Sequence, residues 1–336
     1  MDSARAAAKE LELALIPEKS RLKYLKAYED YTNFVLEHNF AVSGDSLKAY
    51  MMFLKTKYAP SPLWSIQAML KTVFTSKHHD VGETTWLFIH KFIKDYEKKT
   101  SYTSKQAPAF ENDALRKAME ETDLTNPVEV EEHTLVVIAT CGGLRANESY
   151  QLTFEDVQHR PETSEFWITI KVCKNRPQGK QFVITERKYY DIIDTYYQSV
   201  ENKTGPFFRA WHVKAKCFST LCRGKKRFQE VPRRLAEKLG EKEAGSFSHH
   251  SFRRTLATGL HTEHATLEQI RMAGGWKSPA VVSHYIENSV TEKRRTSGLM
   301  QHGKKSKTDN ILPGTLGTLF SGTNFRVESL TINLNK

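Results

Sequence analysis

Apolar side chains recur every three or four positions through the first hundred residues, which is the spacing of amphipathic helices. The pattern predicts helices over about 19–38, 63–74 and 86–96, each with one apolar stripe and a polar face that carries lysines. Residues 1–100 are therefore expected to form one compact helical domain. The first stripe consists of Leu22, Leu25, Tyr28, Tyr31 and Val35.

Residues that favour helix ends bracket two of these segments. Asp45 is predicted to cap a helix that runs to Tyr58 and is ended by the prolines that follow. Ser61 would then cap the next helix, with Pro62 at its first position, because a first-turn residue needs no amide hydrogen.

The pattern changes after the polar stretch 101–109, which lacks periodicity and is predicted to be a linker. Two alternating segments, 166–172 and 181–185, predict strands joined by a basic turn. The expected fold is mostly α with a small antiparallel β-sheet (α+β): a helical N-terminal domain and a mixed domain over 110–300. Pro232 is expected to interrupt one helix of the mixed domain. Its helical patterns cover about 112–121, 128–140, 188–200, 228–239 and 248–288.

Length and charge add a second constraint. A chain of 336 residues favours two domains over one core. The net charge of +11, with basic residues concentrated after residue 170, indicates a polyanionic partner, most simply double-stranded DNA. A single basic cluster is more often a solvated surface, so the inference depends on several of them. The clusters are Arg223-Gly224-Lys225-Lys226-Arg227, Arg233-Arg234 and Lys293-Arg294-Arg295.

Several classes of protein are disfavoured. The sequence has no run of about 20 apolar residues that could span a membrane, and its first residues read as a short helix rather than a secretory signal. The four cysteines lack a C-x-x-C pair and are expected to be reduced thiols of an intracellular protein. The His78-His79 and His249-His250 pairs lack other ligands at metal-binding spacing, so no metal or other cofactor is expected.

Polar and aromatic residues are concentrated between residues 248 and 288. This stretch is predicted to form helical segments broken by Gly274-Gly275. His250 and Arg253 share one helix face because they are three residues apart. Tyr285 follows on a short final helix. A polar, basic helix face followed by one tyrosine is unusual for a scaffold and suggests a reaction site.

A tyrosine that attacks a DNA phosphodiester needs cationic groups to stabilise the pentavalent transition state. Arginines suit this role because each presents a planar fork to nonbridging oxygens. A histidine can donate a hydrogen bond or accept the phenol proton, and a lysine on a mobile turn can protonate the departing sugar oxygen. With these cations in place, no metal is required for charge neutralisation.

The chain supplies such groups outside 248–288 as well. Arg145 follows the Gly142-Gly143 break, and Glu148 lies three residues further on, where it can contact the arginine. Lys174 lies on the basic turn between the two predicted strands. Trp276 directly follows the second glycine pair and could support both the phosphate and the tyrosine helix.

Three segments resemble the boxes of the tyrosine recombinases, the phage-integrase family. GGLRANESYQLTFEDV resembles the first arginine box, HSFRRTLAT the His-x-x-Arg box, and GGWKSPAVVSHY the closing box with the tyrosine. The resemblance covers about residues 110–290, and residues 1–100 fit the helical core-binding domain of the family in length and class. Ser251-Phe252 stand where Asp-Leu is commoner in the family.

The resemblance implies a role for each residue of these boxes. Tyr285 would be the nucleophile, forming a 3′-phosphotyrosyl bond and freeing a 5′-hydroxyl. Arg145 and Arg253 would clamp the scissile phosphate, and His250 and Trp276 would complete the pocket.

The resemblance also implies two supporting roles, a general acid and a residue that orients the first arginine. Lys174 would be the general acid on the hairpin, with Lys180 as the alternative lysine. Glu148 would orient the first arginine. His249 is an alternative register for the box histidine, although only His250 gives His-x-x-Arg.

The reaction implied by the family is site-specific recombination through a Holliday junction, without metal or ATP. It would involve a homo-tetramer on two DNA duplexes, with a dimer on each site. Residues 301–336 would be the segment exchanged between subunits. The tyrosine-rich composition and lysine-rich tail suggest a eukaryotic, crypton-like mobile element, which would place the protein in the nucleus.

Three other readings remain open at this point. A type IB topoisomerase shares the chemistry but relaxes supercoils as a monomer, although the His-x-x-Arg-x-Thr box and the helical N-terminal domain favour a recombinase. A DNA-binding protein that has lost catalysis is disfavoured because every expected residue type is present. A metal-dependent nuclease is disfavoured because clustered carboxylates are missing from the sequence.

Overall fold

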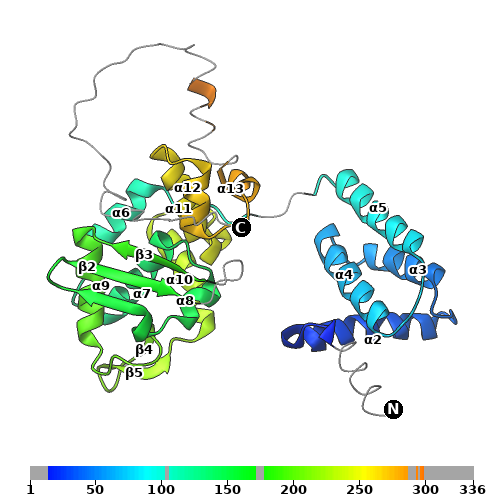
Figure 1. The fold of residues 1–336 in the computed structure, drawn as a ribbon, viewed down its shortest axis with the longest axis horizontal. Helices are drawn as coiled ribbons and strands as arrows, with labels where there is room; N and C mark the ends of the chain where they lie inside the picture. Colours follow the sequence, from blue (N-terminus) through cyan, green and yellow to red (C-terminus); the bar gives the residue numbers. More distant parts are fainter. Residues whose placement is uncertain (1–13, 103–105, 172–177, 287–292, 294–295, 299–336) are drawn as a thin grey trace, which may run out of the picture. The chain divides into compact units, whose positions relative to one another are not determined.

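The computed structural model describes residues 14–102, 106–171, 178–286, 293 and 296–298 (Figure 1). The chain divides into two compact units, Met1–Lys105 and Gln106–Lys336. The described residues are mostly helical with two small antiparallel sheets, which confirms the predicted fold class. Within these ranges, no helix is both long and apolar enough to span a membrane.

The first unit is a helical bundle. Its core forms where α2 packs on α4 and α3 packs on α5. Tyr31, Leu47, Leu70 and Ile93, one from each of these four helices, are all fully buried. The elements are η1 (Glu18–Ser20), α2 (Arg21–Glu37), α3 (Gly44–Lys55), α4 (Pro60–Ser76) and α5 (Glu83–Lys99).

The buried face of α2 differs from the predicted stripe. Leu22 is 84% exposed and Leu25 39% exposed, whereas Ala27 and Phe34 are buried together with Tyr31. Periodicity shows that a helix has an apolar side, but the neighbouring helices decide which residues they cover. The predicted stripe was therefore wrong at its N-terminal end.

Two predicted helix starts were also wrong, each by two residues. Ser43, not Asp45, caps α3, and its hydroxyl accepts a hydrogen bond from the Ser46 amide at 3.2 Å. Helix α4 begins at Pro60, so Ser61 and the next proline already lie inside its first turn. Proline fits a first helical position because its φ is already helical, and Pro60 takes that place.

The second unit contains one largely buried helix, α7, which contacts α9, α10 and α11 (Figure 1). Helix α10 is continuous through Pro232, so the predicted interruption was wrong. The helices are α6 (Asn112–Glu120), α7 (Pro127–Cys141), α8 (Ala146–Gln151), α9 (Arg187–Ser199), α10 (Lys225–Lys238), α11 (His249–Thr262), α12 (Leu267–Gly274) and α13 (Pro279–Ile286), with short turns η2 (Phe154–Asp156) and η3 (Ala244–Ser246).

The predicted strand pair belongs to a three-stranded sheet. Strands β1 (Val157–Arg160), β2 (Glu165–Ile170) and β3 (Lys180–Ile184) run antiparallel in the order β1-β2-β3, and Ile170 pairs with Lys180. A second sheet pairs β4 (Arg209–His212) with β5 (Cys217–Cys222). Strands β1, β4 and β5 were not predicted, because their sequences (VQHR, RAWH and CFSTLC) lack a clear alternation of apolar and polar residues.

Candidate active site

Two glycine turns from distant parts of the second unit lie against each other. Gly143 follows α7 and has φ +53°, and a Cβ atom there would lie 3.6 Å from the Cα of Gly274 and 2.6 Å from Leu256 Cδ2. A side chain at Gly143 would therefore be strained in conformation and would clash with α11. This close approach brings the start of α8 beside the α12–α13 turn.

Lys180 is buried where the two turns meet. It is 8% exposed, and its ammonium group donates a hydrogen bond to the carbonyl of Gly142. Its Cδ lies 4.0 Å from the position that a Cβ of Gly275 would take. The alternative lysine of the sequence interpretation thus lies between the turns that precede Arg145 and Trp276.

Arg145 occupies the N-cap position of α8 and is held by Glu148. The Arg145 amide donates to Glu148 Oε2 at 2.9 Å, and its Nη1 donates to Oε1 at 2.6 Å. The Glu148 side chain is 5% exposed and that of Arg145 is 23% exposed. One buried carboxylate therefore caps the helix and also fixes the direction of the guanidinium group.

Trp276 lies between Arg253 and Tyr285. The guanidinium carbon of Arg253 is 4.8 Å from the centroid of the Trp276 ring, and the ring centroids of Trp276 and Tyr285 are 5.3 Å apart. Arg253, on α11, is 1% exposed and donates from Nη1 to the carbonyl of Gly143. The structure thus brings together the second arginine, the tryptophan and the tyrosine.

Two donors in this group point to an anion. Arg253 Nη2 and Trp276 Nε1 are buried and have no hydrogen-bond partner among the described residues. A buried donor without a partner is costly, and native sites that contain one commonly complete it with a ligand or water. A phosphate oxygen would satisfy either donor.

Electrostatic interactions connect the same residues. Burial lowers the pKa of Arg253, and the positive charge of Arg145 lowers it further, whereas Tyr285 and Glu148 act in the opposite direction. The guanidinium groups therefore lie close enough to repel each other. An anion placed between them would relieve that repulsion.

The two adjacent histidines face different surroundings. His249 is 4% exposed, its Nε2 lies 3.0 Å from Ser149 Oγ, and burial lowers its pKa to about 4. His250 is exposed, and its pKa is lowered by desolvation and then by Arg253 and Arg145. Arg253 thus affects the pKa of both histidines, and Arg145 affects that of the exposed His250.

Two predicted features lie outside the described residues. One is Lys174, which falls between β2 and β3 in the sequence, and the other is the tail 301–336. The basic helix expected after Tyr285 is also largely outside them.

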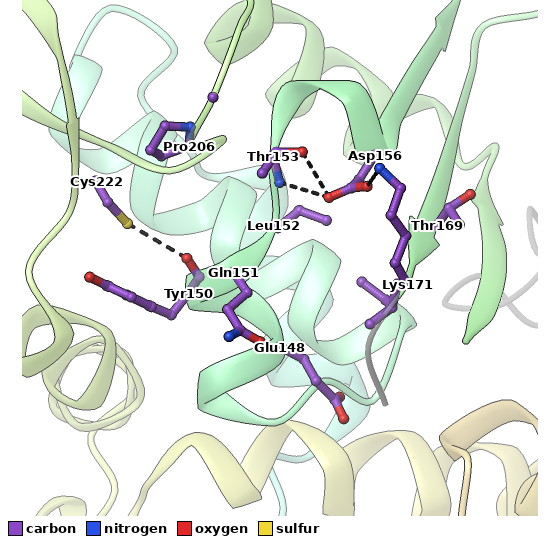
Figure 2. Close-up of a pocket in the computed structure, with 12 residues that line it drawn as sticks. Glu148, Tyr150, Gln151, Leu152, Thr153, Asp156, Thr169, Lys171, Pro206 and Cys222 are labelled. Carbon is purple, nitrogen blue, oxygen red and sulfur yellow. Dashed lines mark hydrogen bonds and ion pairs between the residues drawn. The ribbon is translucent and has the colours of Figure 1, made fainter. Parts of the chain in front are cut away.

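A pocket of about 540 Å³ adjoins Glu148 on α8 (Figure 2). At its rim Lys171 forms a 2.6 Å ion pair with Asp156, whose carboxylate also accepts hydrogen bonds from Thr153. Cys222 lines the opposite side, where its thiol donates to the Tyr150 carbonyl at 3.7 Å. The pocket thus joins the neighbourhood of Arg145 to the end of β2.

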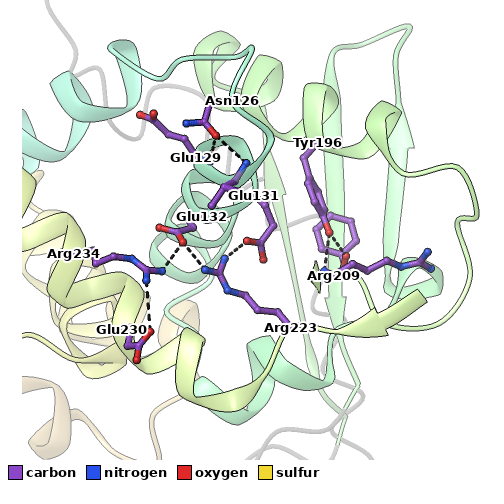
Figure 3. Close-up of polar contacts among 11 residues, drawn as sticks. Asn126, Glu129, Glu131, Glu132, Tyr196, Arg209, Arg223, Glu230 and Arg234 are labelled. Atoms are coloured by element: carbon purple, nitrogen blue, oxygen red, sulfur yellow. Dashed lines mark hydrogen bonds and ion pairs between the residues drawn. The ribbon is translucent and has the colours of Figure 1, made fainter. Parts of the chain in front are cut away.

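Part of the basic sequence expected to face DNA is buried instead (Figure 3). Arg223 is 1% exposed and forms ion pairs with Glu131 and Glu132 of α7. Arg234 contacts the same Glu132 oxygen at 2.5 Å. Burial, followed by the charges of Arg234 and Arg227, lowers the pKa of Arg223 to about 9. These two arginines hold α10 and its preceding loop to α7, so the reading of Arg223 as DNA-facing was wrong.

The sequence of this second unit matches a known family model. Residues 108–292 match the model described as "Phage integrase family". The chain belongs to the phage integrase family. It is a tyrosine recombinase, an enzyme of site-specific DNA recombination. No curated protein resembles the chain closely enough to count as a match.

Solved structures of integrases share the fold at low sequence identity. The Tn1549 transposon integrase in complex with transposon right end DNA is 11% identical, with a TM-score of 0.53 over 86% of this chain and 99% of that one. Its complex with circular intermediate DNA is 14% identical, with a TM-score of 0.51 over 85% and 98%. A lambda integrase dimer bound to a COC′ core site is 11% identical, with a TM-score of 0.50 over 94% and 99%.

Sequence reasoning missed one residue of this region. Arg254 lies beside Arg253 in the sequence, but its guanidinium binds the backbone of the tyrosine helix α13. Nothing in a run of two arginines shows that one would face the candidate site and the other a neighbouring helix. Only helical geometry, with about 100° between successive side chains, separates them.

Proposed function

We propose that this recombinase cleaves and rejoins DNA through a covalent 3′-phosphotyrosine intermediate on Tyr285. The observation that carries the proposal is the contact series Arg253–Trp276–Tyr285, with two unpartnered buried donors beside it. A phosphodiester bound to those donors would lie next to the only tyrosine ring in contact with Trp276 among the described residues.

In the proposed reaction the Tyr285 oxygen forms a bond to phosphorus and the bond to the 5′ oxygen breaks. The guanidinium groups of Arg145 and Arg253 neutralise the negative charge of the nonbridging oxygens. Because Arg253 is buried, water screens its interaction with the phosphate only weakly. His250 either donates to the phosphate or accepts the phenol proton. The number of phosphoester bonds is unchanged, so the step needs no ATP, and the arginines supply positive charge without a metal.

The departing 5′ oxygen needs a proton, and we assign its delivery to Lys174 on the β2–β3 turn. Lys180 is the alternative, and its ammonium group at the Gly142 carbonyl supports a structural role next to the site. Removing each lysine separately should distinguish them, because only loss of the general acid slows the departure of the 5′ oxygen itself.

Double-stranded DNA is the proposed substrate, and a homo-tetramer on two duplexes, acting through a Holliday junction, is the proposed assembly. The integrases of similar fold were solved with DNA, one of them as a dimer on a core site. The net charge of +11 favours the same partner. The first unit would serve as the core-binding domain, and 301–336 as the segment exchanged between subunits.

The proposal is tested with a nicked suicide DNA duplex taken from the ends of the native element. Wild-type protein should form an adduct that survives denaturant and forms in the presence of EDTA. Tyr285→Phe should bind the same DNA with unchanged affinity and form no adduct. An adduct that persists in this variant would exclude Tyr285 as the nucleophile. Supercoil relaxation by a monomer, without junction intermediates, would favour the topoisomerase reading.

A further inference from the structure

Arg254 binds the backbone of the helix that carries Tyr285. Its Nε donates to the carbonyl of Tyr285 at 3.2 Å, and its Nη2 lies 3.4 Å from the carbonyl of His284. The guanidinium carbon is 5.9 Å from the Tyr285 ring.

The same guanidinium group holds the first residues of the second unit. Its Nη1 donates to the Ala107 carbonyl at 3.1 Å, and its Nη2 donates to Gln106 Oε1 at 2.5 Å. These residues directly follow the division between the two units. Arg254 is 8% exposed, so hydrogen bonds to these four uncharged oxygens replace most of the water that would otherwise solvate its positive charge.

Gln106 closes the arrangement into a ring of contacts. Since its Oε1 accepts from Arg254, its amide nitrogen is directed to His284 Nε2, which lies 2.6 Å away. An amide nitrogen can only donate, so this histidine nitrogen is the acceptor. A few residues on, the Phe110 amide donates to Thr255 Oγ1 of α11 at 2.9 Å. The segment after the linker is thus fixed to both α11 and α13.

We infer that Arg254 is a positioning residue for the Tyr285 nucleophile and that it couples the start of the second unit, residues 106–107, to the tyrosine helix. From α11, its guanidinium group binds backbone oxygens of both the segment after the linker and α13. Loss of this group would leave α13 attached mainly by Val282 and Ile286, which pack on α11. The inference depends on the proposed function of Tyr285.

The mechanism predicts which substitutions are tolerated. Arg254→Gln loses the charge and most of the donors. Arg254→Lys keeps the charge but cannot reach backbone oxygens on two elements at once, because an ammonium group lacks the planar fork. Gln106→Ala removes the side-chain contacts with Arg254 and His284 but leaves the bonds from Arg254 to the Ala107 carbonyl and to α13.

The experiment measures three quantities for the full-length protein: the rate of adduct formation on the suicide duplex, the dissociation constant for the same duplex, and amide hydrogen exchange over 279–286. Arg254→Gln should slow adduct formation by about 10- to 100-fold, the order expected for a misplaced reacting group. Its DNA affinity should stay within about twofold of wild type, and exchange in α13 should accelerate. Arg254→Lys should rescue little, and Gln106→Ala should slow the reaction by a smaller factor.

Arg187→Gln provides the matched control, because Arg187 is an exposed helical arginine that pairs with Asp191 at 3.1 Å on α9. It should react at the wild-type rate. Equal losses of DNA affinity and adduct rate for Arg254→Gln would indicate general misfolding and would overturn the inference. An adduct rate equal to that of the wild type would also overturn it. If the wild-type protein forms no adduct, the proposed function of Tyr285 is wrong. The comparison of hydrogen exchange over 279–286 between wild type and Arg254→Gln still shows whether Arg254 holds α13.

Discussion

Replacement of Glu148 offers a quantitative test of how the first arginine is held. The Glu148 carboxylate accepts two hydrogen bonds from one residue, at 2.9 Å from the Arg145 amide and at 2.6 Å from its guanidinium Nη1. The carboxylate is 5% exposed, so Glu148→Ala removes a contact that is largely shielded from solvent. The arginine would keep its charge but lose its fixed direction.

The magnitude follows from the bond that orients the guanidinium group. A hydrogen bond to a charged group contributes about 1.5–3 kcal/mol. If the transition state depends on that orientation, adduct formation should slow by about 10- to 150-fold, since about 1.4 kcal/mol corresponds to a factor of ten. Glu148→Gln keeps an acceptor for the amide and should show a smaller loss.

The assay is adduct formation on the suicide duplex, with thermal unfolding measured in parallel. Asp113→Asn is the control, because Asp113 forms the same type of pair with Arg116, three residues away at 3.5 Å, but is 96% exposed. Exposed pairs contribute little, so this variant should react normally. If both Glu148 variants form the adduct at the wild-type rate, Glu148 does not orient Arg145. The same conclusion follows if the adduct rate falls only as much as the fraction of folded protein.

Two further predictions concern stability and packing. Burial lowers the pKa of both His249 and His133 to about 4, so between about pH 6.5 and pH 4 the unfolded chain binds more protons than the folded one. The melting temperature should therefore fall as the pH drops through this window, and His249→Gln should flatten the slope; an unchanged slope would show that His249 does not contribute. In Gly274→Ala the new Cβ would lie 1.8 Å from the Trp276 ring, so the ring must leave its present position beside Arg253 and Tyr285. We expect the adduct rate to fall with DNA affinity retained, and a normal rate would contradict the packing argument.

The local chemistry of the site could be predicted from the sequence. Arg145 and Glu148 interact because three residues separate them at a helix start, and the strand pair 166–172 and 181–185 is visible from its alternation. His250 could be preferred over its neighbour from the spacing to Arg253 alone. Each of these inferences uses contacts within a few residues along the chain.

Other features depended on contacts between distant segments. The sequence places Arg223 in a basic run, yet Glu131 and Glu132 bury it, because α7 packs beside the loop that carries it. Leu22 continues an apolar stripe that no partner helix covers. Composition and periodicity describe a single helix or strand. Whether a residue on that element is buried depends on which other element packs against it.

The active-site geometry likewise depends partly on local sequence and partly on contacts between distant segments. The sequence by itself determined which side chains are available, because their chemistry and short-range spacing are local properties. Tertiary structure alone decided that the glycine turns at Gly143 and Gly274 lie against each other, and so that Trp276 lies between an arginine and a tyrosine. It also turned Arg254 towards α13 while Arg253 faces Trp276, since adjacent residues on a helix point in different directions and each finds its own partner.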